Sequence, residues 1–513
     1  VATQTGGAIT ADGLLLLGTG AVTLNQSGND VTAIAAASST GTGSYNGTIA
    51  YTDVDTLAVG TVGATSGITT STDDVKLTVE TGDLTIDQAV LLGTTAAASG
   101  HLTLDVHDGN ITQSAAIRAN GLQLTGAGGD VTLTHASNDV VTLAANRDGQ
   151  IAYTDANTLT VGTVTDGPSG MSTSGITTLN DNVTLNVTTG GLVIDDDVTL
   201  GAGDLTLNVV GAVTQNVGDS ITAAGLELLG AGTVRLNDAG NDVDTIAANY
   251  NGTISFTDQD TLTVGTVNTV GITTSADDVT LIAGGNLMLA QAVNLTGGDL
   301  TLNVTGDVSQ TMAGTISAAG LRLLGTGTVT LNNGGNNVST LAADYNGTIA
   351  YTDDDGLTVG AVTDNTHVTA ATTTGLTTSN DDVKLTVESN GLLVDAKVAL
   401  GTGNLTLDVM GAVTQNTGDT ITAGGLQLGV GTVTLTDANN NVSTIAANYD
   451  GAIAYTDANG LIVGTVVDGP SGMSTTGITT SNDSVTLNVA AGGLTIDDDI
   501  ALGAANLTLN VTG

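Results

Sequence analysis

Residues 485–511 read VTLNVAAGGLTIDDDIALGAANLTLNV, and this stretch decides the fold class. Apolar residues alternate with polar ones in short runs, at 485–489, 494–496, 500–502 and 507–511. Alternation with period two is typical of β-strands, and the Gly-Gly and Asp-rich segments between the runs are typical of corners. Because no helical segment separates the runs, parallel pairing of these strands cannot be of the βαβ kind. The stretch therefore predicts roughly three short strands and three corners.

Composition and charge exclude several functional classes. The chain has 513 residues, with 51 acidic side chains against 7 basic ones, no Cys, no Trp and one Phe. Without Cys there is no disulfide, no thiolate metal site and no cysteine nucleophile. Phosphate binding needs clustered Lys and Arg, which this sequence lacks, so we expect no nucleic-acid partner. No apolar run approaches the ~18 residues that span a bilayer, so we expect no membrane insertion of this segment.

One unit recurs along the whole sequence. A Gln in the pattern x-[VIA]-[TS]-Q returns at Gln4, Gln113, Gln215, Gln310 and Gln415. Cutting three residues before each Gln gives the repeats 1–109, 110–211, 212–306, 307–411 and 412–513. Each repeat also carries, in this order, a Gly-Leu pair, an Asn before Asp/Asn-Val, a [YF]-T-D step and a G-[IL]-T-T step. We therefore expect five repeats in one continuous solenoid. Because both ends lie in repeat register, we expect an internal segment of a longer chain.

The length of the repeats favours a coil of parallel strands. The shortest repeat has 95 residues, and a fifth of it, about 19 residues, is the length of one turn of a three-faced parallel β-coil. Five repeats of about five turns each would stack at ~4.8 Å a turn, with aliphatic residues inside and Thr and Asn outside. The alternative is a string of antiparallel β-sandwiches of about 100 residues each. The missing Trp, the scarce Pro and the short strands disfavour that alternative.

All nine aromatic residues fall on two repeat positions. The first position precedes Thr-Asp, and we expect its rings to pack in the core or at a corner. It holds Tyr51, Tyr153, Phe256, Tyr351 and Tyr455. The second position lies six residues earlier, with Arg147 in one repeat and tyrosines in the other four. These are Tyr45, Tyr250, Tyr345 and Tyr449. Because an Asn-Gly or Asp-Gly turn follows, we expect these four to be exposed, as weak candidates for stacking on glycans. The alternative is a structural role.

The T-D-x-[DN] step after the first aromatic resembles the opening of a calcium loop, which needs several hard oxygen ligands. It gives six weak candidates for metal ligands: Asp53, Asp55, Asp258, Asp260, Asp353 and Asp355. The downstream Gly and Glu of such a loop are missing, and an Asp after a strand also caps a corner, so we favour a structural turn. We expect no cofactor beyond weak Ca²⁺ binding to the acidic surface.

Catalytic residues are not expected in this sequence. The seven basic residues are scattered, the four His residues occupy unrelated repeat positions, and no nucleophile motif occurs. An enzyme on a parallel β-coil needs a base, cations and metal-binding acids on one face. We therefore predict that the chain is not an enzyme, and we predict no cofactor-binding residues.

Residues 121–164, GLQLTGAGGDVTLTHASNDVVTLAANRDGQIAYTDANTLTVGTV, resemble the repeats of filamentous-haemagglutinin-like large bacterial exoproteins. The likeness extends over all five repeats. It implies a right-handed parallel β-helix, secretion to the bacterial cell surface, and adhesive or fibre-forming work. The expected function is the structural repeat region of a giant secreted surface protein, acting as adhesin shaft or extracellular fibre. Neighbouring copies of itself or host-cell glycans are the expected partners. Two alternatives stay open, a glycan-binding adhesive module and a surface-layer or sheath subunit.

Overall fold

The computed structural model describes residues 1–94, 97–367, 369–429 and 431–512. All helix or strand elements among these residues are β-strands. The part of the chain described here has no helix of the length and apolarity that crossing a membrane requires. The chain divides into two compact units, Val1–Thr245 and Ile246–Gly513.

In the first unit, coil strands that follow the first turn pair with their counterparts in the turn before and in the turn after. For example, β10 (Val75–Val79) pairs in parallel with β5 (Ile49–Asp53) and with β14 (His101–Val106). In the β5 ladder Leu77 lies opposite Tyr51. Parallel pairing between consecutive segments of one chain, with no helix between them, defines a parallel β-solenoid. The prediction of an all-β parallel coil is confirmed, and the alternative of antiparallel sandwiches is wrong.

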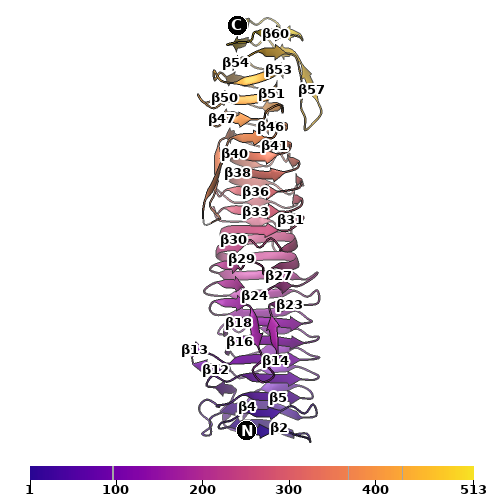
Figure 1. The fold of residues 1–513 in the computed structure, drawn as a ribbon, viewed down its shortest axis with the longest axis vertical. Helices are drawn as coiled ribbons and strands as arrows, with labels where there is room; N and C mark the ends of the chain where they lie inside the picture. The colour runs from indigo at the N-terminus through magenta and orange to yellow at the C-terminus, as the bar shows by residue number, and fades with distance from the viewer. Residues whose placement is uncertain (95–96, 368, 430, 513) are drawn as a thin grey trace. The chain divides into compact units, whose positions relative to one another are not determined.

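The second unit has the same construction. Here β46 (Val383–Val387) pairs in parallel with β41 (Ile349–Asp353) and with β49 (Leu405–Val409) (Figure 1). Leu385 lies opposite Leu407 in the second of these ladders. Inward residues of successive turns therefore stack on one another, as the alternation of apolar residues predicts.

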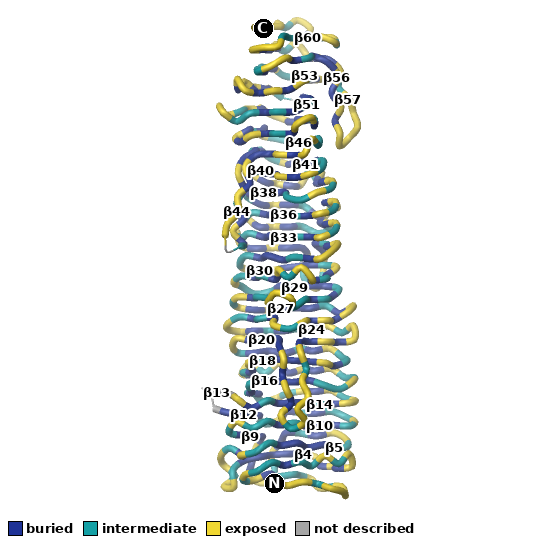
Figure 2. The backbone as a smooth tube through the Cα atoms, in the orientation of Figure 1, coloured by how far each residue is buried: buried dark blue, intermediate teal, exposed yellow. Residues whose placement is uncertain are grey.

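The core of each unit is a column of aliphatic side chains inside the coil. In β24 (Val183–Val187) the inward residues Val183, Leu185 and Val187 are at most 1% exposed, whereas Thr184 between them is half-buried. Buried residues alternate along the strands and exposed ones gather at the corners (Figure 2). Complete burial of a Val or Leu side chain stabilises a fold by about 1.5–3 kcal/mol, so this column is the main source of stability.

One long strand in each of several turns pairs with two strands of the following turn. In the first unit β18 (Asp139–Arg147) pairs with β20 (Leu159–Val161) and also with β23 (Ile176–Thr177). Between these two strands the chain leaves the coil as an antiparallel hairpin of β21 (Thr163–Thr165) and β22 (Ser172–Ser174). We call such a hairpin an arm and name it by its residues, here the 163–174 arm.

A backbone hydrogen bond closes the neck of the arm. The N–H of Gly175 donates to the carbonyl of Gly162 at 3.1 Å, so the chain re-enters the coil where it left. Gly175 has φ +65°, and a Cβ there would lie 2.0 Å from the Asp197 carbonyl oxygen, which explains the Gly of the G-[IL]-T-T step. Arm length can therefore vary between repeats without disturbing the coil.

Three more arms have the same neck. They are the 61–66 arm of β7 (Thr61–Val62) and β8 (Thr65–Ser66), the 361–374 arm of β43 (Ala361–Asp364) and β44 (Ala371–Thr374), and the 465–476 arm of β56 (Thr465–Val467) and β57 (Ser474–Thr476). Their necks are closed by backbone bonds between Gly67 and Gly60, Gly375 and Gly360, and Gly477 and Gly464. At 266–270 the described residues form only a single antiparallel bridge, between Thr266 and Val270.

Candidate functional site

The aspartate that opens each T-D-x-[DN] step lies inside the fold. Asp53 is 0% exposed, and its Oδ2 accepts hydrogen bonds from the N–H of Val31 at 2.9 Å and from the Tyr51 hydroxyl at 2.6 Å. Its Oδ1 accepts from the N–H of Asp55 at 3.1 Å. Both carboxylate oxygens therefore bind donors of the protein itself, which is the geometry of a corner cap.

The equivalent aspartates of the second unit repeat this cap. Asp353 accepts from Val338 N–H, from the Tyr351 hydroxyl and from Asp355 N–H, at 2.9, 2.6 and 3.1 Å. Asp258 is 1% exposed and accepts from the N–H of Asp260 at 3.0 Å. Asp55 and Asp260 are exposed at the corners and Asp355 is half-buried. Within the described ranges, no three or more His, Cys, Asp or Glu side chains are placed to hold a metal ion together. The geometry favours the structural turn over the calcium loop for these six residues.

Burial raises the pKa of the carboxyl and hydroxyl groups in these caps. In the first unit Asp155 accepts from Val140 N–H at 2.9 Å and from the Tyr153 hydroxyl at 2.8 Å. Burial raises the pKa of Asp155 to about 6, although these hydrogen bonds and one from Asn157 N–H act in the opposite direction. Burial also raises the pKa of the Tyr153 hydroxyl well above its usual value. The rings at the first aromatic position are all buried, as predicted, and each is at most 1% exposed.

The marker Asn of each repeat is the centre of a buried polar network. Asn138 is 0% exposed, and its Oδ1 accepts from Gln113 Nε2 at 2.5 Å and from Ile117 N–H at 2.9 Å. Its Nδ2 donates to the carbonyls of Leu133 and Thr154, both at 3.1 Å. Gln113 ends β15 (Ile111–Gln113), and its ladder continues through the strands that hold Leu133 and Thr154. One amide thus links three successive turns.

The same network surrounds each marker Asn. Asn29, Asn241, Asn336 and Asn440 are also 0% exposed. Each accepts a hydrogen bond from the marker Gln of its own repeat, Gln4, Gln215, Gln310 or Gln415. A buried amide with its donors and acceptor satisfied stabilises a fold, whereas one left unpaired costs about 1–3 kcal/mol. The Gln and Asn that mark the repeats in the sequence are therefore structural partners.

The tyrosines of the second aromatic position are Tyr45, Tyr250, Tyr345 and Tyr449, of which the side chain of Tyr449 lies outside the described part. The first three are only 2–3% exposed, so their predicted exposure is wrong. The Tyr45 hydroxyl donates to the Gly20 carbonyl at 2.5 Å, and the Tyr345 hydroxyl donates to the Thr326 carbonyl at 2.8 Å. Burial raises the pKa of both Tyr250 and Tyr345 to about 12. These rings turn inward because their hydroxyl groups bind carbonyls of neighbouring turns at the corner, and a buried ring cannot stack on a sugar.

Arg147 occupies the same corner in the repeat that lacks the tyrosine. It is 2% exposed, and its Nη1 donates to the carbonyls of Val106 at 2.8 Å and Thr125 at 3.1 Å. Its Nη2 donates to the carbonyls of Gly109 and Gly128, both at 2.6 Å. Burial lowers the pKa of this guanidinium. Arginine thus replaces tyrosine here as a donor to corner carbonyls.

The 163–174 arm folds back over the outer face of earlier turns. Its Asp166 is 0% exposed, and Lys76 on β10, 90 residues earlier, places Nζ 2.9 Å from Asp166 Oδ2. Val164 of the arm is 1% exposed and packs on Gly121, where a Cβ would lie 2.8 Å from Val164 Cγ1. The ion pair and the valine over a glycine hold this arm on the coil together with hydrogen bonds from Gln123 Nε2 to the Thr173 hydroxyl at 2.7 Å and from His101 Nδ1 to the Thr165 carbonyl at 2.8 Å.

The 465–476 arm is held in the same way. Asp468 is 0% exposed and accepts a hydrogen bond from Lys384 Nζ at 2.6 Å. Val466 lies over Gly425, where a Cβ would be 2.7 Å from Val466 Cγ1. The Gly of the Gly-Leu pair faces the arm valine in four repeats: Gly13 faces Val62, Gly121 Val164, Gly320 Val362 and Gly425 Val466. This marker is a glycine because a side chain would displace the arm.

In the 361–374 arm the cation has moved along the same face. Thr280, the second residue of β33 (Val279–Ala283), occupies the position that Lys76 has in β10 and Lys384 has in β46. Arg322, which lies in register with Thr280 two turns further on, places Nη1 3.6 Å from Asp364 Oδ2 and donates from Nε to Thr373 at 2.7 Å. Burial acts to raise the pKa of Asp364, but hydrogen bonds from Thr366 and Thr280 and the nearby His367 outweigh it and lower the pKa. Each of the three longer arms therefore sets one buried carboxylate against one cation.

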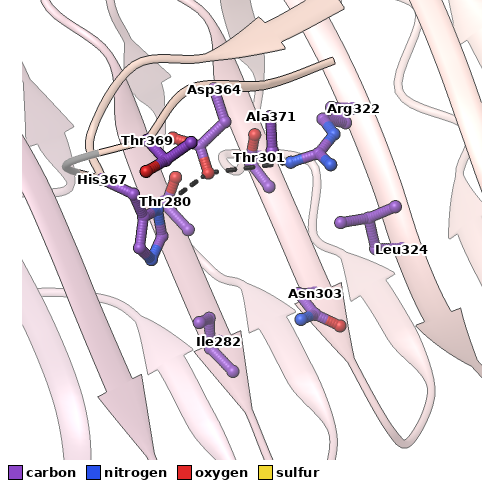
Figure 3. Close-up of a pocket in the computed structure, with 10 residues that line it drawn as sticks. All are labelled: Thr280, Ile282, Thr301, Asn303, Arg322, Leu324, Asp364, His367, Thr369 and Ala371. Atoms are coloured by element: carbon purple, nitrogen blue, oxygen red, sulfur yellow. Dashed lines mark hydrogen bonds and ion pairs between the residues drawn. The ribbon is translucent and has the colours of Figure 1, made fainter. Parts of the chain in front are cut away.

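A cavity of about 540 Å³ lies between the 361–374 arm and the coil face (Figure 3). Its floor is formed by Thr280, Ile282, Thr301, Asn303, Arg322 and Leu324, and its cover by Asp364, His367, Thr369 and Ala371. A smaller hollow of about 180 Å³ beneath the 163–174 arm shares three of these floor positions, as Lys76, Thr78 and Asp105, and extends from there over earlier turns of the coil. The face under the arms is therefore a recurrent site whose contents differ between repeats.

The arms and their ion pairs are not among the features predicted from the sequence. Lys76, Arg322 and Lys384 belong to the basic residues that are scattered along the sequence, but each faces the carboxylate of an arm. A usable signal was present, because the segment of variable length begins and ends at glycines and holds an Asp after an alternating run. The partners of that Asp lie 84 or more residues away in two of the arms, which no local pattern reveals.

Comparison with known families finds one match. Residues 81–146, 180–249 and 276–344 each match a family described as repeats of unknown function (DUF5649). Comparison with curated proteins and with solved structures gives no match. Each matched stretch contains the marker Gly-Leu pair of one repeat, at Gly121, Gly225 or Gly320, and one buried marker Asn, namely Asn138, Asn241 or Asn336. The chain is thus a tandem-repeat β-solenoid that is similar, over these three stretches, to that repeat family.

Proposed function

We propose that this chain belongs to the repeat region of a giant secreted bacterial surface protein, where it serves as adhesin shaft or extracellular fibre. The observation that carries the proposal is the buried Gln–Asn network, which links three successive turns and recurs at five places. A chain whose turns are joined by backbone ladders, buried amides and arms resists unravelling under tension. The likeness to filamentous-haemagglutinin-like exoproteins supports the same role.

The finer architecture is part of this proposal. We propose one continuous right-handed solenoid of five repeats of about 100 residues, with about five turns in each repeat. The five equivalent sets of Gln, Asn and Asp support this division. An electron cryomicroscopy map of the native protein would test the handedness and the count of repeats.

Surface labelling tests the location. Antibodies against this chain, applied to intact cells of the source organism, are expected to label the cell surface before permeabilisation. Labelling that appears only after permeabilisation would contradict secretion. Negative-stain images of the native material then separate the shaft from the sheath. Single thin fibres are expected for a shaft, whereas ordered lateral bundles would favour a surface-layer or sheath subunit that binds neighbouring copies.

Glycan binding is the second candidate, and the tyrosines no longer support it. Tyr45, Tyr250 and Tyr345 are buried, so their rings offer no exposed surface on which a sugar could stack. The specific observation in its favour is the cavity under the 361–374 arm. No catalytic role and no required metal ion form part of the proposal.

A further inference from the structure

The floor beneath the 361–374 arm differs from the floors beneath the other two longer arms. Its six residues stand in two rows across β33, β36 (Leu300–Val304) and β38 (Ile316–Thr326), the row Thr280, Thr301, Arg322 and the row Ile282, Asn303, Leu324. In the second row the counterparts are Thr78, Asp105 and Thr125 under the 163–174 arm. Under the 465–476 arm they are Thr386, Asp408 and Gly429. Among the three longer arms, only the 361–374 arm has an amide, Asn303, at the central position where the others have a carboxylate. Its neighbours in the row, Ile282 and Leu324, are both aliphatic.

These exchanges accompany a larger space than the hollow beneath the 163–174 arm. Under the 163–174 arm, Lys76 lies between Asp166 and Asp105, with Nζ 2.9 and 3.5 Å from their carboxylates. Under the 361–374 arm that lysine is Thr280, and the cavity is about 540 Å³ against about 180 Å³. Small-molecule sites have volumes of roughly 300–1,000 Å³, with mostly apolar walls and a few fixed polar groups.

Of the polar groups of this cavity, Arg322 is held in place, and part of its hydrogen-bonding capacity is unused. The Arg322 side chain is 10% exposed and is held by Thr373 and Asp364. Among the described residues no hydrogen-bond partner occurs for Arg322 Nη2 or for the Asn303 amide, and both residues line the cavity (Figure 3). The cavity therefore offers a guanidinium donor and an amide that both donates and accepts.

Charge and shape restrict the class of ligand. The Arg322 cation already faces the Asp364 carboxylate, and the whole chain carries a formal charge of −44, so an anionic ligand gains little. The described residues that line the cavity include no Phe, Tyr or Trp, and their one ring, the His367 imidazole, has its Nδ1 3.1 Å from Asp364 Oδ2, so a planar base has little ring surface to stack on. Ile282 and Leu324 offer apolar surface beside the donors and the acceptor.

We propose that the cavity under the 361–374 arm binds one neutral sugar ring, free or at the end of a glycan. A pyranose presents C–H faces to Ile282 and Leu324 and hydroxyl groups to Arg322 Nη2 and the Asn303 amide. The site is separate from the shaft role, because it uses one arm whereas the networks that carry that role recur at five places. Loss of the sugar site would therefore leave the shaft proposal intact.

Saturation-transfer NMR on the full chain tests the site directly. The probes are glucose, galactose, mannose and N-acetylglucosamine, with glucuronate and adenosine as the charged and planar comparisons. We expect saturation of at least one neutral sugar with a millimolar Kd. Absence of transfer to all four neutral sugars, or tighter binding of glucuronate or adenosine, would overturn the proposal.

Two variants convert the floor to that of the other arms. Asn303→Asp introduces the carboxylate found at Asp105 and Asp408, and Ile282→Thr removes the apolar wall without touching the arm ion pair. Each is expected to weaken sugar binding about tenfold, the worth of one good hydrogen bond or apolar contact. Asn208→Asp makes the same exchange at the equivalent, exposed position of β27 (Asp204–Val210) and should leave binding unchanged. Binding that survives both floor variants, or that falls equally in the control, contradicts the assignment.

Discussion

The ion pair between Lys76 and Asp166 should decide whether the 163–174 arm stays on the coil. In Lys76→Met the ammonium group is replaced by an apolar side chain of similar length, while the Asp166 carboxylate, 1% exposed, keeps its place under the arm. Loss of one partner of a buried pair costs about 3–5 kcal/mol. The Lys76 side chain is 20% exposed, so solvent screens part of this interaction and about 2–3 kcal/mol is the better figure here.

We expect this loss of free energy to undock the 163–174 arm and to leave the coil folded. Asp166 regains solvent when the arm leaves the face, whereas the core strands beneath keep their ladders. A cost of 2–3 kcal/mol corresponds to roughly a 30- to 150-fold change in the opening equilibrium. Hydrogen–deuterium exchange measured by mass spectrometry should therefore show a 30- to 150-fold loss of protection at residues 163–174.

The chain contains its own control. The 465–476 arm carries the identical tip segment DGPSGMST, at 468–475 as at 166–173, and rests on Lys384. It should keep its protection in Lys76→Met and lose it in Lys384→Met, where the 163–174 arm is unaffected. Adding Asp166→Asn to Lys76→Met should restore most of the protection. The reasoning fails if the 163–174 arm stays protected in Lys76→Met, or if both arms lose protection together.

Three other perturbations test the packing and the buried caps. Gly121→Ala places a Cβ 2.8 Å from Val164 Cγ1, so we expect docking of the 163–174 arm to be weakened by about 1–3 kcal/mol. Limited proteolysis should then cleave the arm faster than in the parent. Equal cleavage rates would show that the coil backbone shifts to accommodate the Cβ while the arm stays docked. Tyr351→Phe removes one donor from the buried Asp353, so the free energy of unfolding should fall by about 1–2 kcal/mol in denaturant titration, and an unchanged value would assign the cap to the backbone donors alone. Asp155 has a pKa raised to about 6 against 3.8 unfolded, so its folded state binds a proton more readily. Its contribution is fully present below about pH 4 and is lost as the pH rises through 6, by up to about 3 kcal/mol. The gap in thermal stability between the parent and Asp155→Asn should thus shift toward the parent on acidification from pH 7 to 4, and a gap that does not change with pH would refute the raised pKa.

The coil could be predicted from the sequence because its rules are local. Alternation such as that of Val485, Leu487 and Val489 indicates a strand with one buried face. The Gly- and Asp-rich segments between such runs indicate that the chain turns there without forming a helix. The burial of Tyr51, which we expect in the core or at a corner, agrees with this alternation. These features depend on residues within a few positions of one another, which a sequence displays directly.

The arms and the second tyrosine set could not be predicted because their partners are distant in sequence. Val164 alternates with its neighbours as a coil strand does, and only its contact with Gly121 shows that it lies outside the coil. Tyr345 precedes Asn-Gly, a signal for an exposed turn, but its hydroxyl finds the Thr326 carbonyl of an adjacent turn. Asn336 marks its repeat in the sequence, but its role depends on Gln310 in the preceding turn and on the carbonyls of Leu331 and Thr352, which no local pattern reveals.

The direction in which the arms fold back bears on the order of folding. Each longer arm docks on residues that precede it in the chain: Asp166 on Lys76, 90 residues earlier, Asp468 on Lys384, 84 earlier, and Thr366 on Thr280, 86 earlier. Such contacts raise the contact order locally and would be slow to form by random search. In a chain that emerges from its N-terminus, however, the docking face is complete before the arm exists. An arm can therefore close without waiting for later sequence, and the solenoid can grow vectorially, with each arm adding its contact only after the turns beneath it have formed.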